Sequence, residues 1–227
     1  LSHARQRAAG GRVNIAADIK KAEAQVERNP SDAQKESGVY RKGHVRLHGL
    51  DVTIENPKGA ERSGVDKGGK PWSVKMPASY GYVLGTRGAD KDHVDVYIGP
   101  DVASEKVFVV DQVVAETGKF DEHKCMLGFA SKDAATACYE KAFSDDKGKD
   151  RIGSVTEMTI DRFKDWLRDG DTTKPLGRKG YAEGGSVTPY DVARGFVGQR
   201  EGPTNAMLND FLNNGGRGLT SDQFAWC

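Results

Sequence analysis

Hydrophobic and polar residues alternate along much of the middle of the chain. Val45 and Leu47 alternate with polar neighbours, and Val52 and Ile54 do so again beyond Gly49, which predicts two paired strands. The turn-like segment 116–119 predicts a hairpin between the strands on either side of it. In full, strands are expected at 44–47, 52–54, 72–76, 96–98, 106–114, 123–129 and 152–158.

The period changes to that of an amphipathic helix in three places. Asn14 can cap a helix over 15–28, and Ser131 can cap one that runs to about Phe143. Thr159 can cap a third helix that stops at Gly170. Many short strands followed by helix, strand and helix are typical of a small barrel with helices packed outside it. The pattern therefore predicts an α+β fold with a mainly β core.

Glycine-rich segments on both sides of this core indicate linkers. The chain starts with Leu1 instead of Met, and residues 181–187 loosely resemble residues 8–13, so we expect a fragment of a larger multidomain protein. The expected organisation has four parts: an N-terminal helical and linker segment at 1–42, the barrel domain at 43–175, a glycine-rich linker at 176–187 and a helical segment at 188–227.

Composition excludes several classes of protein. The net charge of +1 gives no overall field that would attract nucleic acid or a membrane. The three cysteines have no C-x-x-C spacing, which disfavours a disulfide scaffold or a zinc knuckle and fits a reducing compartment. No apolar run reaches membrane-spanning length, and the amino terminus lacks the apolar core of a secretion signal.

Three carboxylates lie within six residues at Asp90, Asp92 and Asp95, ahead of a predicted strand. Like charges at this spacing repel one another unless something positive is bound or water solvates them. Two interpretations follow: a solvated acidic turn, or a site for hard divalent cations, which take several oxygen ligands. An EF-hand loop fits badly, because Val94 and Asp95 fall where that loop needs a ligand and a glycine.

More acids and a cationic loop extend the second interpretation. The loop predicted at 56–71 is rich in glycine and carries Lys58 and Arg62, which suits an anion. Divalent ions beside such a loop would favour hydrolysis of a phosphate-rich ligand. The further acids next to predicted strands are Glu55, Asp111, Glu116, Asp121 and Glu122.

One combination of motifs resembles a known family. Tyr80-Gly81-Tyr82, followed by Asp90-x-Asp92-x-x-Asp95, resembles the signature of the soluble, Mg²⁺-dependent family I inorganic pyrophosphatases. Residues 43–175 resemble the pyrophosphatase-like domain of large phage and mobile-element proteins. The further matching segments are 54–59, Trp72, 120–124 and 127–129. This resemblance implies an OB-like five-stranded barrel with flanking helices.

The resemblance also implies roles for particular residues. Asp90 and Asp95 would bind metal, with Asp95 bridging two ions, and Asp92 would accept the proton of the attacking water. Tyr80 would contact phosphate, and Glu55 would be a further metal-linked acid. At least two Mg²⁺ ions are expected.

Other parts of the family pattern are displaced. The interval from Glu55 to Tyr80 is shorter than in the bacterial enzymes, so residue counting along the family pattern does not locate the phosphate-binding Lys and Arg. Lys58 and Arg62 are proposed for these roles without that alignment. Asp121 or Glu122, together with Asp111 or Glu116, would supply the second acidic pair. The remaining substrate-binding candidates are Lys124, Tyr139 and Lys141.

A second resemblance lies at the carboxyl end. Residues 209–216 followed by Ala225-Trp226-Cys227 resemble the entry to papain-like (NlpC- or CHAP-type) cell-wall peptidases, in which Cys227 would be the nucleophile. The alternative is an ordinary cysteine. Every histidine lies upstream in other elements, so this chain as given does not complete such a site.

Together these observations predict Mg²⁺-dependent hydrolysis of pyrophosphate or a related phosphoanhydride. The chain would act beside other domains or virion proteins of its parent polypeptide, in a phage virion or the host cytoplasm. The main alternative is a catalytically inactive barrel that serves as a structural or anchoring module. An OB-type nucleic-acid binder is disfavoured by the dense acids at 90–95.

Overall fold

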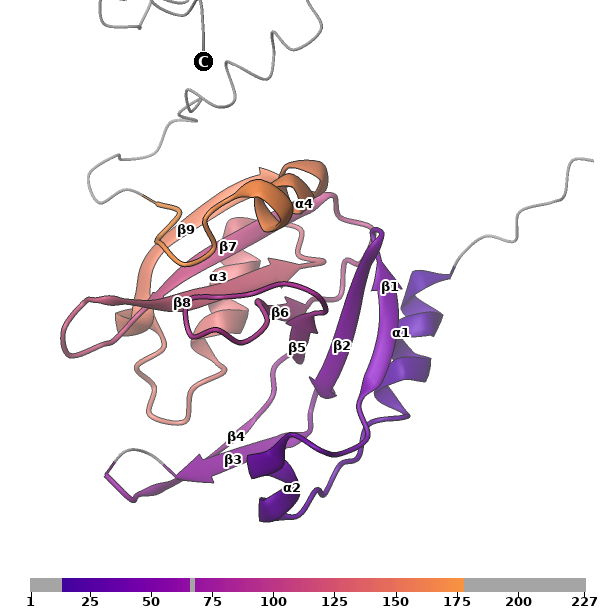
Figure 1. Cartoon of the computed structure of the whole chain (residues 1–227), viewed down its shortest axis with the longest axis vertical. Coiled ribbons are helices and arrows are strands. Elements are labelled where there is room, and N and C mark those ends of the chain that lie inside the picture. The colour runs from indigo at the N-terminus through magenta and orange to yellow at the C-terminus, as the bar shows by residue number, and fades with distance from the viewer. Residues whose placement is uncertain (1–13, 66–67, 178–227) are drawn as a thin grey trace, which may run out of the picture. The chain divides into compact units, whose positions relative to one another are not determined.

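One mixed β-sheet organises the fold of the part that the structure, a computed structural model, describes, which is residues 14–65 and 68–177 (Figure 1). Strands β6 and β8 run parallel, and the other neighbours in the sheet run antiparallel. The seven strands, in their order across the sheet, are β1 (Gly43–Leu47), β2 (Leu50–Asn56), β5 (Ser79–Val83), β6 (Asp95–Ile98), β8 (Phe120–Leu127), β7 (Lys106–Val113) and β9 (Ile152–Thr159).

The predicted α+β class is confirmed, but the predicted five-stranded closed barrel is not. Strands β1 and β9 are the two edges of the sheet, and no ladder joins them in the described residues, so the sheet stays open. Strand β8 inserts between β6 and β7, and β9 extends the sheet beyond β7. The sheet therefore has more strands than the expected barrel and two separate ends.

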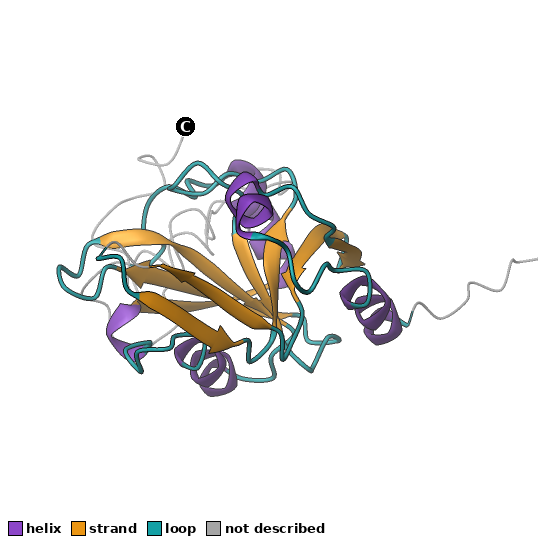
Figure 2. Cartoon of the chain, turned by 90° about the horizontal axis from the view of Figure 1, so that it is seen from below, coloured by secondary structure: helices purple, strands orange, loops and turns teal. Residues whose placement is uncertain are grey.

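Helices lie on both faces of this sheet (Figure 2). A separate two-stranded hairpin continues from the ends of β2 and β5. Within the described residues no helix has both the length and the apolar character needed to cross a membrane. The remaining elements are α1 (Ile15–Glu23), α2 (Asp32–Ser37), β3 (Glu61–Val65), β4 (Pro71–Lys75), α3 (Lys132–Glu140), a 3-10 turn η1 (Lys149–Arg151) and α4 (Ile160–Asp169).

The three predicted helices and their caps are confirmed. The side chains of Asn14, Ser131 and Thr159 each accept a hydrogen bond from a backbone N–H in the first turn of α1, α3 and α4. Helix α1 is shorter than predicted, since it ends at Glu23. Helix α2 was not predicted, although Ser31 and Gln34 form a reciprocal capping box at its start.

The predicted loop at 56–71 is wrong in part, because β3 lies within it. Strand β3 pairs with β4 in register from Glu61–Lys75 to Val65–Pro71. Its residues alternate between exposed and half-buried, so Arg62 and Gly64 share the covered side. Trp72 crosses closely over Gly64, where a Cβ atom would lie 2.7 Å from the indole ring. Glycine is therefore required there by close packing.

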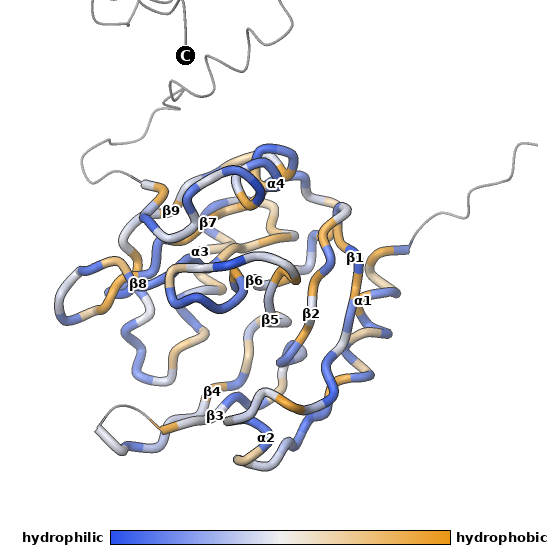
Figure 3. Tube along the Cα trace, in the orientation of Figure 1, coloured by the Kyte–Doolittle hydropathy of each residue, from blue (hydrophilic) through white to orange (hydrophobic). Residues whose placement is uncertain are grey.

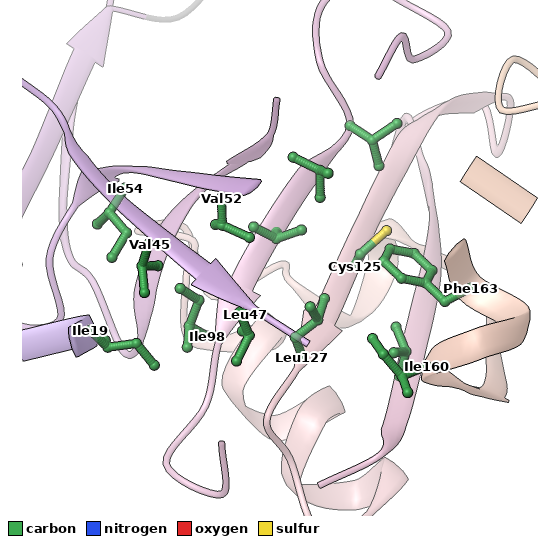
Figure 4. Packing of buried hydrophobic residues seen from close by; sticks show 14 of the residues in the cluster. Ile19, Val45, Leu47, Val52, Ile54, Ile98, Cys125, Leu127, Ile160 and Phe163 are labelled. Atoms are coloured by element: carbon green, nitrogen blue, oxygen red, sulfur yellow. The ribbon is translucent and has the colours of Figure 1, made fainter. Parts of the chain in front are cut away.

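Alternation along β7 creates two hydrophobic layers. Val107 and Val109 face the layer that contains Phe163 of α4, and Phe108 and Val110 face the layer that contains Tyr139 of α3. The first layer also receives side chains from α1 and β1, as the close view shows (Figure 4). Burying each large apolar side chain stabilises the fold by about 1.5–3 kcal/mol. Both faces of the sheet are thus anchored.

The C-terminal predictions cannot be compared with this fold. The linker beyond residue 177, the helical segment expected at 188–227, and Cys227 lie outside the described residues. The peptidase resemblance therefore stays a prediction.

Candidate active site

On the α3 side of the sheet, polar side chains lie next to the hydrophobic layer and continue the same face of the strands. Strand register sets Tyr82 opposite Asp95, Asp95 opposite Lys124, and Gln112 opposite Glu122. Alternate residues of a strand share a face, so Asp95, Lys124, Glu122 and Gln112 lie on the same face as Tyr97, Met126 and Phe108. The fold thus brings four neighbouring strands to one polar cluster.

Lys124 is the centre of this cluster. Its ammonium group contacts a carboxylate oxygen of Asp95, lies 2.8 Å from Glu122 Oε2 and donates to the Tyr80 hydroxyl at 3.2 Å. Burial opposes the charge, but Tyr80, Asp95 and Glu122 outweigh it and raise the pKa of Lys124 well above its ordinary value. Lys124 is therefore a permanent buried cation.

Glu122 is half-buried between the charged groups of Lys124 and Asp95. Burial raises its pKa to about 7, an effect that Lys124 opposes and the neighbouring Asp95 carboxylate reinforces. Asp95 itself accepts a hydrogen bond from the Tyr80 hydroxyl at 2.6 Å. Two acidic groups share a single ammonium group, so the charge balance of the cluster favours a further cation.

Gln112, which the sequence analysis did not select, joins two of the predicted metal ligands. Its side-chain nitrogen lies 3.0 Å from both Asp121 Oδ2 and Glu122 Oε1. The Tyr139 hydroxyl donates to the Gln112 side-chain oxygen at 2.9 Å. Tyr139 is fully buried, so it reaches the cluster from beneath.

Arg62 forms the wall of the cluster opposite the strands. Its guanidinium carbon lies 5.0 Å from the Tyr80 ring and 5.4 Å from the Trp72 ring, within cation–π range. Burial opposes its charge, but Tyr80, Tyr97 and Asp95 outweigh this and raise the pKa of Arg62. The separate β3–β4 hairpin therefore brings a second, half-buried cation to the same tyrosine.

Glu55 lies near this wall but has its own partner. Its carboxylate is 2.6 Å from the ammonium group of Lys42, which also lies over the rings of Tyr40 and Tyr82. Lys42 and Tyr40 come from the segment ahead of β1 and were not predicted as site residues. Lys42 and Tyr40 belong to no recognisable sequence motif, so the sequence alone does not mark them as site residues.

Asp90 and Asp92 lie in the hydrophilic loop between β5 and β6 (Figure 3). Both are exposed, and the Asp90 side chain accepts a hydrogen bond from the backbone N–H of Asp92 at 3.0 Å. The backbone carbonyl of Asp92 in turn accepts from the N–H of Gly88 at 2.6 Å. These bonds order the loop that leads into Asp95.

The predicted metal ligands are divided among three places. Among residues 14–65 and 68–177, no group of three or more His, Cys, Asp or Glu side chains converges in an arrangement that could hold a metal ion. Asp95, Asp121 and Glu122 come closest, since they share Lys124 and Gln112 as partners. Their hard oxygen donors fit Mg²⁺ chemically. The metal roles of all five predicted ligands stay predictions.

The remaining candidates are scattered. Lys58 is exposed, and its backbone N–H donates to Ser79 Oγ at 2.9 Å. Lys141 is exposed just beyond α3, and Glu116 is exposed in the β7–β8 turn. The structure does not bring these three side chains into the cluster around Lys124.

Asp111 lies on the opposite face of the sheet from Gln112. Its carboxylate accepts from Ser154 Oγ at 2.7 Å and from the backbone N–H groups of Leu176 and Gly177 at 3.0 and 2.7 Å. Its Oδ1 also lies 3.0 Å from His123 Nδ1. Asp111 therefore fastens Leu176 and Gly177 to the sheet. Its side chain lies on the face of the sheet that is turned away from the acidic cluster.

The buried Lys124 and the half-buried Arg62 lie with two hydroxyl-bearing rings beside crowded acids, an arrangement that suits a polyanion and is of the kind found in phosphate-handling hydrolases. The family model described as Inorganic Pyrophosphatase matches residues 32–168. This match covers more than half of the chain, and the chain belongs to the inorganic pyrophosphatase family.

The other comparisons are weaker. No curated protein matches the chain. A solved structure titled as an inorganic phosphatase from Anaplasma phagocytophilum is similar at 14% identity, over 58% of this chain and 91% of that one. Its TM-score of 0.32 is too low to support a conclusion about the fold.

Proposed function

We propose that this domain hydrolyses pyrophosphate or a related phosphoanhydride with Mg²⁺. The observation that carries the proposal is the convergence of Arg62 and Lys124 on Tyr80. The two cationic groups lie 5.0 and 5.5 Å from the centre of that ring, beside the carboxylates of Asp95 and Glu122. Cations next to acids suit a substrate that brings both phosphate oxygens and divalent ions.

The residues divide into two groups by charge. Asp95, Asp121 and Glu122 would hold the cations, and Arg62 and Lys124 would bind the phosphate oxygens and stabilise the charge that develops on them. When bound, Mg²⁺ screens the phosphate charge and makes a nearby water more acidic. The Tyr80 hydroxyl, which donates to Asp95, keeps that carboxylate in one orientation.

Asp92 is the proposed proton acceptor. It is exposed on the loop that enters β6, and that loop is ordered by its own hydrogen bonds. A carboxylate that is not paired with a buried cation can accept the proton of the attacking water. The neighbouring Asp90 carboxylate accepts from the Asp92 backbone and limits the movement of this loop.

The test is phosphate release from pyrophosphate in the presence of Mg²⁺. Asp92→Asn should lower kcat by about 100-fold or more, the usual contribution of a general base. Asp101→Asn, which changes an exposed aspartate beyond the other end of β6, is the matched control and should release phosphate at the wild-type rate. Folded wild-type protein that releases no phosphate would refute the proposed activity, and full activity of Asp92→Asn would remove Asp92 from its role.

The substrate class is tested in the same assay. A phosphoanhydride such as a nucleoside triphosphate should be compared with a phosphomonoester, which lacks the second phosphoryl group. Paired cations at Arg62 and Lys124 favour the anhydride, because each can bind a different phosphoryl group. Faster hydrolysis of the monoester would contradict this assignment.

The wider setting is proposed from the resemblance alone. We infer that the chain is part of a larger phage-type multidomain protein, with the pyrophosphatase-like domain at 43–175 and the beginning of a peptidase domain at 188–227. Sequencing of the complete gene tests this inference. A gene that encodes no catalytic histidine downstream of Cys227 would refute the peptidase assignment.

A further inference from the structure

Gln112 is an uncharged side chain at the meeting point of two acids. It is the last buried residue of β7 on the face of the cluster and is only 7% exposed. A glutamine at this depth needs partners for both ends of its amide, since an unpaired buried polar group costs about 1–3 kcal/mol. Its partners are Asp121, Glu122 and Tyr139.

These partners determine the orientation of the amide. Asp121 Oδ2 and Glu122 Oε1 are the acceptors at this place, so the amide nitrogen, which is the donor end, faces both of them. The amide oxygen then faces the Tyr139 hydroxyl, which donates to it at 2.9 Å. The reversed amide would place its oxygen against both acids. Tyr139 and the two carboxylates thus specify one arrangement.

The amide leaves the other carboxylate oxygens for further ligands. It binds Asp121 through Oδ2 and Glu122 through Oε1, and Glu122 Oε2 faces Lys124. Ligating carboxylates in proteins are commonly held by such a second set of hydrogen bonds, and loss of one of them typically weakens metal binding by about 10–100-fold. Gln112 has the geometry of such a partner for two acids at once.

We propose that Gln112 is a positioning residue, which holds Asp121 and Glu122 in the orientation that binds a divalent cation and is itself held by Tyr139. The inference rests on the proposed cation-dependent hydrolysis. It extends that proposal, because it makes the cation affinity of Asp121 and Glu122 depend on a neutral amide that does not touch the reacting atoms.

The experiment is a calorimetric titration of the full chain with Mn²⁺ in the absence of pyrophosphate. Gln112→Met keeps the length of the side chain and removes both hydrogen bonds to the acids. It should raise the Kd for Mn²⁺ by about tenfold or more. Tyr139→Phe removes only the hydroxyl that orients the amide and should raise the Kd by a smaller factor. It preserves the buried ring, so it tests the same point if Gln112→Met fails to fold.

Ser154→Ala is the matched control. Ser154 also donates a side-chain hydrogen bond to a carboxylate, that of Asp111 on β7, but it does so on the opposite face of the sheet. Its Kd for Mn²⁺ should equal that of the wild type. In turnover assays, Gln112→Met should raise the Mg²⁺ concentration that gives half-maximal rate, and saturating Mg²⁺ should restore most of kcat.

Two results overturn the inference. One is an unchanged Kd in folded Gln112→Met and Tyr139→Phe, and the other is wild-type protein that binds no Mn²⁺. Failure of the proposed function is distinguishable from the first result, because it would appear as wild-type protein that binds Mn²⁺ and releases no phosphate.

Discussion

The substitution Asp111→Asn tests how the segment that contains Leu176 and Gly177 is fastened to the sheet. Asp111 is 2% exposed and accepts three hydrogen bonds, from Ser154 Oγ and from the backbone N–H groups of Leu176 and Gly177. Asparagine has the same shape, but one of its two terminal groups is a donor. That group must face at least one backbone N–H, whichever way the amide turns.

The expected loss of stability follows from these contacts. A hydrogen bond to a charged group contributes about 1.5–3 kcal/mol, and a bond to a neutral group contributes about half as much. Asp111→Asn removes one bond to a backbone N–H and weakens the two that remain. The free energy of unfolding should therefore fall by about 3 kcal/mol, a large part of the usual stability of a domain.

Two measurements check this expectation. Urea unfolding followed by circular dichroism gives the change in free energy, and amide hydrogen exchange reports whether Leu176 and Gly177 lose protection. Asp101→Asn is the control and should leave both unchanged, because Asp101 is exposed. A change below about 1 kcal/mol together with unaltered protection of the two amides would refute the reasoning, since single buried hydrogen bonds already contribute that much.

The pH dependence of this effect has a definite sign. Burial raises the pKa of Asp111, but the nearby His123 ring and the donors from Ser154 and the backbone outweigh burial and lower it below its ordinary value of 3.8. The stabilisation by Asp111 is thus fully present above pH 3.8. It is lost as the pH falls through the lower pKa of the folded state. The difference between wild type and Asp111→Asn should shrink only in that acidic range.

Two further predictions concern the cluster itself. Arg62→Lys should raise the KM for pyrophosphate about tenfold, because a lysine cannot stack its charge over Trp72 and Tyr80 as a planar guanidinium does. Steady-state kinetics check this, with Lys75→Arg on the exposed side of the same hairpin as the control. An unchanged KM for Arg62→Lys would contradict the prediction. Burial raises the pKa of Glu122 from 4.5 to about 7, so the stability linked to its proton is full below pH 4.5 and is lost as the pH rises through 7. The urea midpoint of Glu122→Gln relative to wild type should therefore increase between pH 5 and pH 8, and a constant difference would count against the raised pKa.

Local elements were largely predictable because local interactions specify them. The caps at Asn14, Ser131 and Thr159 are contacts between residues three apart, and the β1–β2 hairpin follows from alternation around Gly49. Strand β3 was missed because its glycine and charged residues carry no apolar alternation. It forms because Trp72 of β4 covers Gly64, and that contact is invisible in either segment alone.

The arrangement of the sheet could not be predicted in the same way. Val96 lies beside Cys125 in the parallel pairing of β6 with β8, and β8 separates β6 from β7. Such pairings depend on contacts between distant segments and have no local signature. Tyr80 and Lys124 could be selected only through the family resemblance, because nothing in the local pattern links either of them to Asp95.

The neighbours Asp111 and Gln112 show where pattern reasoning stops. The preceding residues Val107–Val110 are apolar on both faces of the sheet, so alternation does not indicate which face each side chain takes. The faces are set by pairing with β8 and β9, and both pairings shift register next to Gln112. A slip of one residue would exchange the two side chains, moving a carboxylate into the acidic cluster and an amide against the backbone of Leu176 and Gly177. Asp111 was a candidate for the acidic cluster on sequence alone, but the partners of β7 assign that place to Gln112.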